Sequence, residues 1–244
     1  MSSKFSHHEA CQECGSRNNV GVWTDGSKYC FGCRWFLSHR SMSVKDLKQQ
    51  LKQQEKQNAS IVLPSDCVYA LPSVALNWLK KYGISDKEII QNKFMWSAEK
   101  SGLVFPIYDV FGNLLYYQVR RFGENISKGR YDSRGNADNV FHILGTTVYS
   151  CITLSEDLIS AIKIARQSTA MPLWGSNIPI SRIRVLSDRF KNLLIWLDKD
   201  KYKYAIKAAF RARPYFDNVR VIYSEKDPKE YDDFEISEFI KGSV

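Results

Sequence analysis

The last hundred residues alternate between short apolar runs and segments with helical periodicity. The expected strands cover residues 149–157, 192–200 and 219–227, and the expected helices cover residues 158–167, 203–214 and 234–240. Regular alternation of this kind predicts a parallel sheet, because parallel strands need a long crossover connection, usually a helix. Ligands of such sheets bind at the carboxyl ends of the strands.

Residues 61–147 show a different pattern, in which two short helices come first. We expect Ser73 to cap the first helix and Gly83 to end it, because glycine tolerates the left-handed backbone conformation found at helix ends. Ser85 and Glu88 have the spacing of a capping box, so a second helix should begin there.

Two strand-like runs follow these helices. Residues 103–122 predict a hairpin around Gly112 and Asn113, and Pro106 indicates that its first strand lies at a sheet edge, because proline has no N–H to donate. Cations gather at the end of the second strand and in the loop after it: Arg120, Arg121, Lys128, Arg130 and Arg134. The cluster suits phosphate binding, but a solvated basic surface is an equally good interpretation.

The N-terminal residues form a separate module. Residues 20–29 predict a hairpin, in which Asp25 and Gly26 supply a turn that tolerates positive φ. Residues 41–60 are polar and helix-prone with almost no apolar face, so we interpret them as a tether between this module and the rest of the chain.

Four of the six cysteines lie in the N-terminal module, as two C-x2-C pairs separated by fifteen residues. They are Cys11, Cys14, Cys30 and Cys33. Two residues between thiols let one tight turn present both sulfurs to a tetrahedral ion, and the pattern is that of a four-thiolate zinc site. Because about 40 residues are too few for a core, zinc would supply much of the stability. The alternative is two disulfides or four free thiols, which we consider less favoured in an intracellular chain.

Composition narrows the classes of function. A formal net charge of +9 favours a polyanionic partner, nucleic acid before membrane. No run approaches 18 apolar residues, so no membrane span is expected. The first ten residues lack an apolar signal region, which indicates an intracellular, cytoplasmic protein.

The N-terminal hairpin carries side chains that suit nucleic acid. They are Trp23, Asp25, Ser27, Lys28 and Tyr29. Aromatic rings can stack on bases while neighbouring cations bind phosphates, so single-stranded nucleic acid is the expected ligand. The alternative is that Trp23 and Tyr29 only cover the metal site.

Charged side chains follow each of the three buried C-terminal strands. They are Glu156, then Asp198 and Asp200, then Lys226 and Asp227. Because the carboxyl ends of parallel strands meet at one edge of a sheet, these side chains should lie near one another. Two carboxylates one residue apart can approach a common ion, and oxygen ligands suit Mg²⁺ or Mn²⁺. Any one of these residues taken alone could be a solvated turn residue.

Glu156 at one strand end, the D-x-D of Asp198 and Asp200 at the next, and the "KDPKE" segment at the third together resemble a TOPRIM domain. TOPRIM domains occur in primases, topoisomerases and some nucleases. With a preceding four-cysteine ribbon, tether and basic subdomain, the order of the whole chain resembles the bacteriophage DNA primases. The resemblance covers nearly the full chain.

The resemblance implies roles for particular residues. Glu156, Asp198 and Asp200 would carry the catalytic Mg²⁺ or Mn²⁺ ions. Ribonucleoside triphosphates would be bound by Arg120, Lys128, Arg130, Lys226 and Asp227. The single-stranded DNA template would be bound by Trp23, Asp25, Ser27 and Lys28. No GxxxxGK[ST] motif occurs in the chain, so a replicative helicase would be a separate partner.

The chain departs from the TOPRIM pattern in two places. Asp157 stands where TOPRIM domains usually have a glycine after the glutamate, and Ser160 stands where they usually have an aspartate. Ser27 stands where some phage relatives have a histidine, so no template sequence preference carries over. The first two departures favour a different turn after Glu156.

We interpret the chain as a DNA primase that makes short RNA primers on single-stranded DNA for phage replication, in the cytoplasm of an infected bacterium. A TOPRIM nuclease would use the same carboxylates for hydrolysis, and a non-catalytic zinc-ribbon module would only bind DNA or a replication partner. The expected fold is mixed α+β and α/β. Its parts are a zinc ribbon (1–40), the tether (41–60), a basic α+β subdomain (61–147) and a TOPRIM subdomain with a parallel sheet and crossover helices (148–244).

Overall fold

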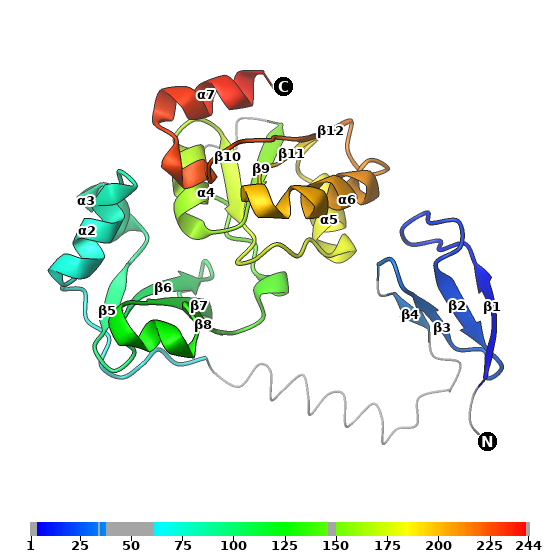
Figure 1. Cartoon of the computed structure of the whole chain (residues 1–244), viewed down its shortest axis with the longest axis horizontal. Helices are drawn as coiled ribbons and strands as arrows, with labels where there is room; N and C mark the ends of the chain where they lie inside the picture. Colours follow the sequence, from blue (N-terminus) through cyan, green and yellow to red (C-terminus); the bar gives the residue numbers. More distant parts are fainter. Residues whose placement is uncertain (1–3, 34, 38–60, 146–149, 243–244) are drawn as a thin grey trace.

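Three four-stranded sheets, one after another along the chain, organise the molecule (Figure 1). The computed structural model describes residues 4–33, 35–37, 61–145 and 150–242, apart from the side chains of residues 124, 125 and 128. The expected tether at 41–60 lies outside the described residues. The domain boundaries at 40, 60 and 147 stay predictions.

The N-terminal sheet is antiparallel. Its strands are, in spatial order, β1 (Phe5–Glu9), β2 (Val20–Trp23), β3 (Lys28–Cys30) and β4 (Phe36–Leu37). The predicted hairpin is β2–β3, and Gly26 in its turn has a φ of 78°. The buried apolar residues of this sheet are only Val20 and Val22 beside two of the cysteines, among the residues described, so a bound ion would have to contribute to its stability.

The middle sheet is also antiparallel, and two helices precede it. The helices are α2 (Ser73–Lys81) and α3 (Asp86–Gln91), and the strands in spatial order are β5 (Met95–Ser97), β6 (Gly102–Tyr108), β7 (Leu114–Arg121) and β8 (Tyr131–Arg134). Short 3-10 turns follow β7 and β8, as η1 (Gly123–Lys128) and η2 (Ala137–Asn139). The capping box of Ser85 and Glu88 is confirmed, and Gly83 follows α2 with a positive φ of 69°.

Two sequence predictions for this region are wrong. Strand β6 is internal, between β5 and β7, although Pro106 predicted an edge strand. The register explains it, because pairing with β5 stops at Val104 and Pro106 needs no N–H toward that side. Ser73 is the first residue of α2, and Pro72 occupies the cap position without a side-chain bond.

The C-terminal sheet is parallel, with strand order β10-β9-β11-β12. Its elements are β9 (Cys151–Ser155), α4 (Leu158–Ala165), β10 (Thr169–Pro172), α5 (Ile180–Ser187), β11 (Asn192–Ile195), η3 (Lys199–Lys201), α6 (Tyr202–Ala212), β12 (Asn218–Val221), η4 (Pro228–Glu230) and α7 (Asp233–Lys241). The predicted fold class is therefore confirmed. The prediction lacked β10 and α5.

Helices cover both faces of the parallel sheet (Figure 1). Helices α5 and α6 pack on one face, where Ile183 and Ala208 join a core with Ile152 of β9. Helices α4 and α7 pack on the other face, where Ile164 and Ile236 lie in one cluster.

Helix α4 also joins the two larger sheets. Leu158, Ile159 and Ile162 pack in a second cluster with Leu79 of α2 and Phe105 of β6. The helix therefore fixes the middle region against the parallel sheet. None of the described helices is long and apolar enough to cross a bilayer.

Candidate active site and zinc site

The four cysteines of the ribbon converge on one point. Their sulfurs all lie within 4.8 Å of one another, and the Cys11–Cys33 and Cys14–Cys30 pairs are each 3.7 Å apart. Zn–S bonds of about 2.3 Å in a tetrahedron put sulfurs about 3.8 Å apart, so the cluster fits zinc.

The thiol of Cys30 has a lowered pKa because backbone N–H groups donate to its sulfur. Burial acts to raise the pKa of the Cys30 thiol, but hydrogen bonds from backbone N–H groups such as that of Cys33 outweigh it and lower the pKa to about 7. Thiolate is the form that binds zinc, so these N–H groups favour the metal-binding state.

The second site is a cavity of about 580 Å³ between the middle region and the parallel sheet. Its lining residues are Trp78, Tyr82, Gln118, Arg120, Arg130, Tyr131, Ser133, Glu156, Asp157, Trp174, Gly175, Asp198, Asp227, Lys229 and Glu230. The parallel sheet contributes the ends of all four strands, since Glu156 follows β9, Trp174 follows β10, Asp198 follows β11 and Asp227 follows β12. The expectation that strand ends gather at one ligand edge therefore holds for Glu156, Asp198 and Asp227.

Glu156 and Asp198 each have a carboxylate oxygen whose burial is not offset by a hydrogen bond. Glu156 Oε2 and Asp198 Oδ1 are buried and have no hydrogen-bond partner among the described residues. Burial raises the pKa of Glu156, and burial with the neighbouring charges of Asp157 and Asp227 raises the pKa of Asp198 to about 7. A divalent cation would relieve this unfavourable burial of negative charge.

Lys229 is the nearest positive charge to this cluster. Its Nζ lies 3.0 Å from Asp157 Oδ2, 3.0 Å from Asp227 Oδ2 and 3.8 Å from Asp198 Oδ2. Burial acts to lower the pKa of Lys229, but the charges of Asp157 and Asp198 outweigh it and hold the pKa above its usual range. The side chain is therefore an ammonium.

The two departures from the TOPRIM pattern form a helix cap. Asp157 is the N-cap of α4, and its carboxylate accepts hydrogen bonds from the Ser160 backbone N–H at 3.0 Å and from the Ser160 hydroxyl at 2.9 Å. Together they hold the start of α4 directly after Glu156, so the turn is well defined despite the missing glycine.

Asp200 lies differently from Asp198. It is in η3, its side chain is 70% exposed, and it pairs with Lys201 outside the lining of the cavity. It remains close enough for its charge to raise the pKa of Glu156. Lys226 is also exposed and outside the lining, with its ammonium 5.4 Å from the Tyr231 ring centre.

Arg120 stands on the opposite wall of the cavity, at the end of β7. Its guanidinium lies 4.5 Å from the Trp78 ring centre, and Nη1 donates weakly to the Tyr131 hydroxyl at 3.5 Å. Its Nε is buried without a hydrogen-bond partner in the described part of the chain. The aromatic contacts fix a guanidinium that faces a polar cavity, which is a geometry suited to an anionic ligand.

The other cations of the predicted cluster do not all lie in the cavity. Arg130 lines the cavity, whereas the side chain of Lys128 lies outside the description. Arg121 and Arg134 form ion pairs with Asp132 of β8. These two arginines therefore pair within the middle sheet and do not line the cavity.

The predicted template residues lie on the β2–β3 hairpin. Asp25 Oδ1 accepts from the Ser27 hydroxyl at 2.6 Å, and Lys28 pairs with Glu9 at 2.7 Å. Trp23 contacts Phe5 edge-on, with ring centres 6.0 Å apart. A template-binding role for these side chains stays a prediction.

The cavity carboxylates do not yet close on one point. Among the described residues, the ribbon thiols are the only His, Cys, Asp or Glu side chains that bring three or more ligand atoms within 4.8 Å of one another. The unpartnered oxygens of Glu156 and Asp198 nevertheless fit a divalent ion, since both are hard oxygen ligands in a polar cavity. Catalytic magnesium or manganese therefore stays a proposal.

The chain thus combines a four-cysteine ribbon, an antiparallel basic region and a four-stranded parallel sheet with helices on both faces, and two solved primase core structures share most of this fold. The Escherichia coli primase catalytic core has a TM-score of 0.55 at 16% identity, covering 81% of this chain and 79% of that one. A DnaG catalytic core structure has a TM-score of 0.54 at 15% identity, covering 81% and 80%.

The other comparisons add no further argument about the fold. The primase fragment of the bacteriophage T7 primase-helicase covers 99% of this chain and 100% of that one, with a TM-score of 0.47 at 16% identity. No protein-family model and no curated protein sequence matches the chain.

Several residues of the cavity were missed from the sequence. Trp78, Tyr131 and Lys229 line it, and none was a candidate. For Lys229 a signal existed, because the D-x-x-E spacing of Asp227 and Glu230 predicts a cap that turns the intervening residues. No local signal places Trp78, which reaches the cavity only through the packing of α2 against α4.

Proposed function

We propose that the protein is a DNA primase that joins ribonucleotides on a single-stranded DNA template. The observation that carries the proposal is the cavity itself. In it, carboxylates from the strand ends of the parallel sheet lie opposite Arg120 of β7 and Arg130, which directly precedes β8. Metal-binding groups opposite phosphate-binding groups are what nucleotidyl transfer requires.

The residues of the cavity would divide the work. Glu156 and Asp198 would hold Mg²⁺ or Mn²⁺, with Asp200 as a further candidate ligand. When bound, the metal would supply charge neutralisation at the α-phosphate and activation of the attacking 3′-hydroxyl. Arg120 would bind triphosphate oxygens, and Trp78 and Tyr131 would keep its guanidinium oriented.

Other residues would act at the margins of the cavity. Arg130 and Lys128 would bind further phosphates of the triphosphate or template. Lys226 and Asp227 stay predicted nucleotide-binding residues. All of these contacts would position the reacting groups, and no covalent intermediate is needed.

The zinc ribbon would hold the template for initiation. Trp23 and Lys28, with Asp25 and Ser27 at the turn, are the side chains we expect to meet DNA. Extension of an existing RNA needs only the cavity, whereas initiation also requires two nucleotides and a template site to be held together. A separate helicase partner stays a prediction from the sequence.

Two rival functions use the same features. A nuclease of this fold would use Glu156 and Asp198 for hydrolysis, and a binding module would use only the ribbon and the cations. The partly buried Arg120, whose guanidinium packs against aromatic rings, favours the primase, because hydrolysis of DNA requires no triphosphate site.

One assay separates the three functions. Zinc-loaded protein is incubated with labelled ribonucleotides, Mg²⁺ and single-stranded DNA, and the products are separated by size. Short RNA products support the primase, DNA fragments would show a nuclease, and DNA binding without products would show a module. Glu156→Gln should abolish RNA synthesis, whereas Glu238→Gln, an exposed α7 residue, should not.

A further inference from the structure

Lys229 occupies an unusual place for a lysine. Its side chain is only 13% exposed, and its ammonium contacts carboxylates that follow three different strands: Asp157, Asp198 and Asp227. Lysines are almost never buried unless they are paired, and this one is paired with an acidic cluster that lines the cavity. The contacts are those that a cation in the cluster would make.

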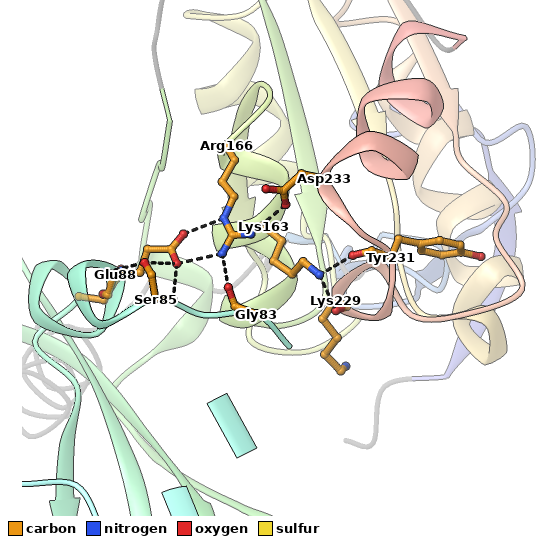
Figure 2. Close-up of polar contacts among 9 residues, drawn as sticks. Gly83, Ser85, Glu88, Lys163, Arg166, Lys229, Tyr231 and Asp233 are labelled. Atoms are coloured by element: carbon orange, nitrogen blue, oxygen red, sulfur yellow. Dashed lines mark hydrogen bonds and ion pairs between the residues drawn. The ribbon is translucent and has the colours of Figure 1, made fainter. Parts of the chain in front are cut away.

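Hydrogen bonds to backbone carbonyl oxygens fix the turn that carries Lys229. Lys163 of α4, 6% exposed, donates hydrogen bonds to the carbonyl oxygens of Lys229, at 3.0 Å, and of Tyr231 (Figure 2). Asp227 and Glu230 close a capping box around the same turn, with Pro228 at its first position. The ammonium is therefore directed into the cluster by a rigid turn.

Helix α4 connects this turn to the middle region. Arg166, at the end of the same helix, binds Glu88 at 2.8 Å, Asp233 at 2.8 Å and the Gly83 carbonyl at 2.8 Å (Figure 2). At its start, Asp157 both caps α4 and binds Lys229. The position of Lys229 is thus fixed by the elements that join the two halves of the cavity.

The carboxylates of the acidic cluster therefore differ in whether they have a partner. Asp157 and Asp227 are each 3.0 Å from the ammonium, whereas Glu156 Oε2 and Asp198 Oδ1 have no partner among the residues described. A divalent ion placed between Asp157 and Asp227 would lie within a few ångströms of a fixed positive charge, where repulsion opposes it. A divalent ion at Glu156 and Asp198 would meet carboxylate oxygens that are still free to bind.

We propose that the Lys229 ammonium takes the place of a divalent cation between Asp157 and Asp227, so that the cavity binds a single divalent ion, at Glu156 and Asp198. The inference rests on the proposed function in one respect, because the ion it counts is the proposed catalytic metal. Lys229 is a positioning residue, which fixes three carboxylates without touching the reacting atoms.

The test is to count bound Mn²⁺ ions. The zinc-loaded full chain is titrated with Mn²⁺, and free Mn²⁺ is followed by electron paramagnetic resonance. The wild-type chain should bind one Mn²⁺ in the cavity. Lys229→Met, which keeps the buried stem but removes the charge, should bind a second Mn²⁺ or bind the first at least tenfold more tightly.

A matched control removes a positive charge nearby. Lys199→Met removes an ammonium that is 53% exposed, in η3 after the neighbouring strand β11, and pairs with Glu225. It should bind Mn²⁺ as the wild type does. Asp198→Asn should lose the wild-type Mn²⁺ site. Zinc content and the thermal unfolding midpoint verify that each variant is folded.

Several results would overturn the inference. They are a wild-type chain that binds no Mn²⁺ or two Mn²⁺ ions in the cavity, a folded Lys229→Met variant with wild-type Mn²⁺ binding, and a Lys199→Met variant with the same change as Lys229→Met. The number of Mn²⁺ ions bound by the wild-type chain tests the proposal even if Lys229→Met does not fold.

Primer synthesis on the same preparations separates the two proposals. If the wild type makes RNA but the Mn²⁺ counts do not follow the expected pattern, the role of Lys229 is wrong and the primase function stands. If the counts follow the pattern but no RNA is made, the role of Lys229 stands and the primase function is wrong.

Discussion

The four-cysteine ribbon and the cavity are two candidate cation sites that are built in opposite ways. In the ribbon, four thiols from 23 consecutive positions lie within 4.8 Å of one another and leave room for one ion. In the cavity, carboxylates from separate strands surround a lysine, and two oxygens remain without partners among the residues described. A structural site is closed by local sequence, whereas a site for chemistry is assembled by the fold and stays open to a ligand.

The largest expected effect breaks the ribbon and spares the cavity. Cys30→Ser with Cys33→Ser removes two of four thiolates, so zinc should fall from one per chain to none. Because bound zinc supplies about 10 kcal/mol or more in small zinc modules, the ribbon should unfold. Metal analysis and NMR spectra of the ribbon resonances measure both effects. Mn²⁺ binding in the cavity should be unchanged; its loss would show that the two sites are coupled.

The second prediction separates the sites physically. A fragment from Asn58 to Val244 keeps both larger sheets and the cavity, so it should extend a short RNA annealed to DNA. It should start new primers at least about tenfold less well than the full chain, because it lacks the hairpin that we propose holds the template. Initiation and extension are compared on the same templates. A fragment that starts primers normally would show that the ribbon does not hold template.

A third prediction concerns acid. Burial lowers the pKa of His142 to about 4, below the ordinary value near 6.5, so the folded protein favours the neutral ring. The unfolded chain binds the extra proton between these values, so the free energy of unfolding should fall with pH from about 6.5 to 4, by at most about 3 kcal/mol.

His142→Phe cannot take up that proton and should show a smaller fall over the same range. Urea unfolding of the wild type and the variant at pH 7, 5.5 and 4.5 measures the fall in the free energy of unfolding. An equal fall in the variant would assign the acid sensitivity to other groups.

The smallest expected effect concerns the helix caps of the middle region. Ser85→Ala removes the capping box of α3 and should lower the free energy of unfolding by about 1 kcal/mol. Ser73→Ala is the matched control, because Ser73 makes no cap bond and should change stability by only a few tenths of a kcal/mol. Urea unfolding of both variants measures the difference, and equal losses would refute the assignment of the caps.

Local patterns in the sequence predict the elements that depend on neighbouring residues. The β2–β3 hairpin, the capping box at Ser85 and the three apolar strands are of this kind. Strand β10 (Thr169–Pro172) was missed because Pro172 interrupts the apolar residues at 170–174, and a proline within a run argues against a strand. The place of Pro106 depends on how far β5 extends, which no residue near Pro106 records.

The same division holds for the candidate site. The rule that parallel strand ends meet at one edge brings Glu156, Asp198 and Asp227 together without any structure. The contacts of Arg120 and Lys229 depend instead on α4, which packs the middle region against the sheet. Residues that reach a site through the packing of two regions leave no pattern at their own position.

The most direct measurement of the central claim is extension of an RNA annealed to a DNA template by the wild type and Asp198→Asn, at saturating Mg²⁺. Loss of a carboxylate with an unpartnered buried oxygen should lower the rate at least about a hundredfold, because metal-ion catalysis supplies several kcal/mol. Asp188→Asn, at the exposed end of α5, should extend at the wild-type rate. A folded Asp198→Asn variant that extends RNA as fast as the wild type would contradict the assignment of this cavity as the centre of RNA synthesis.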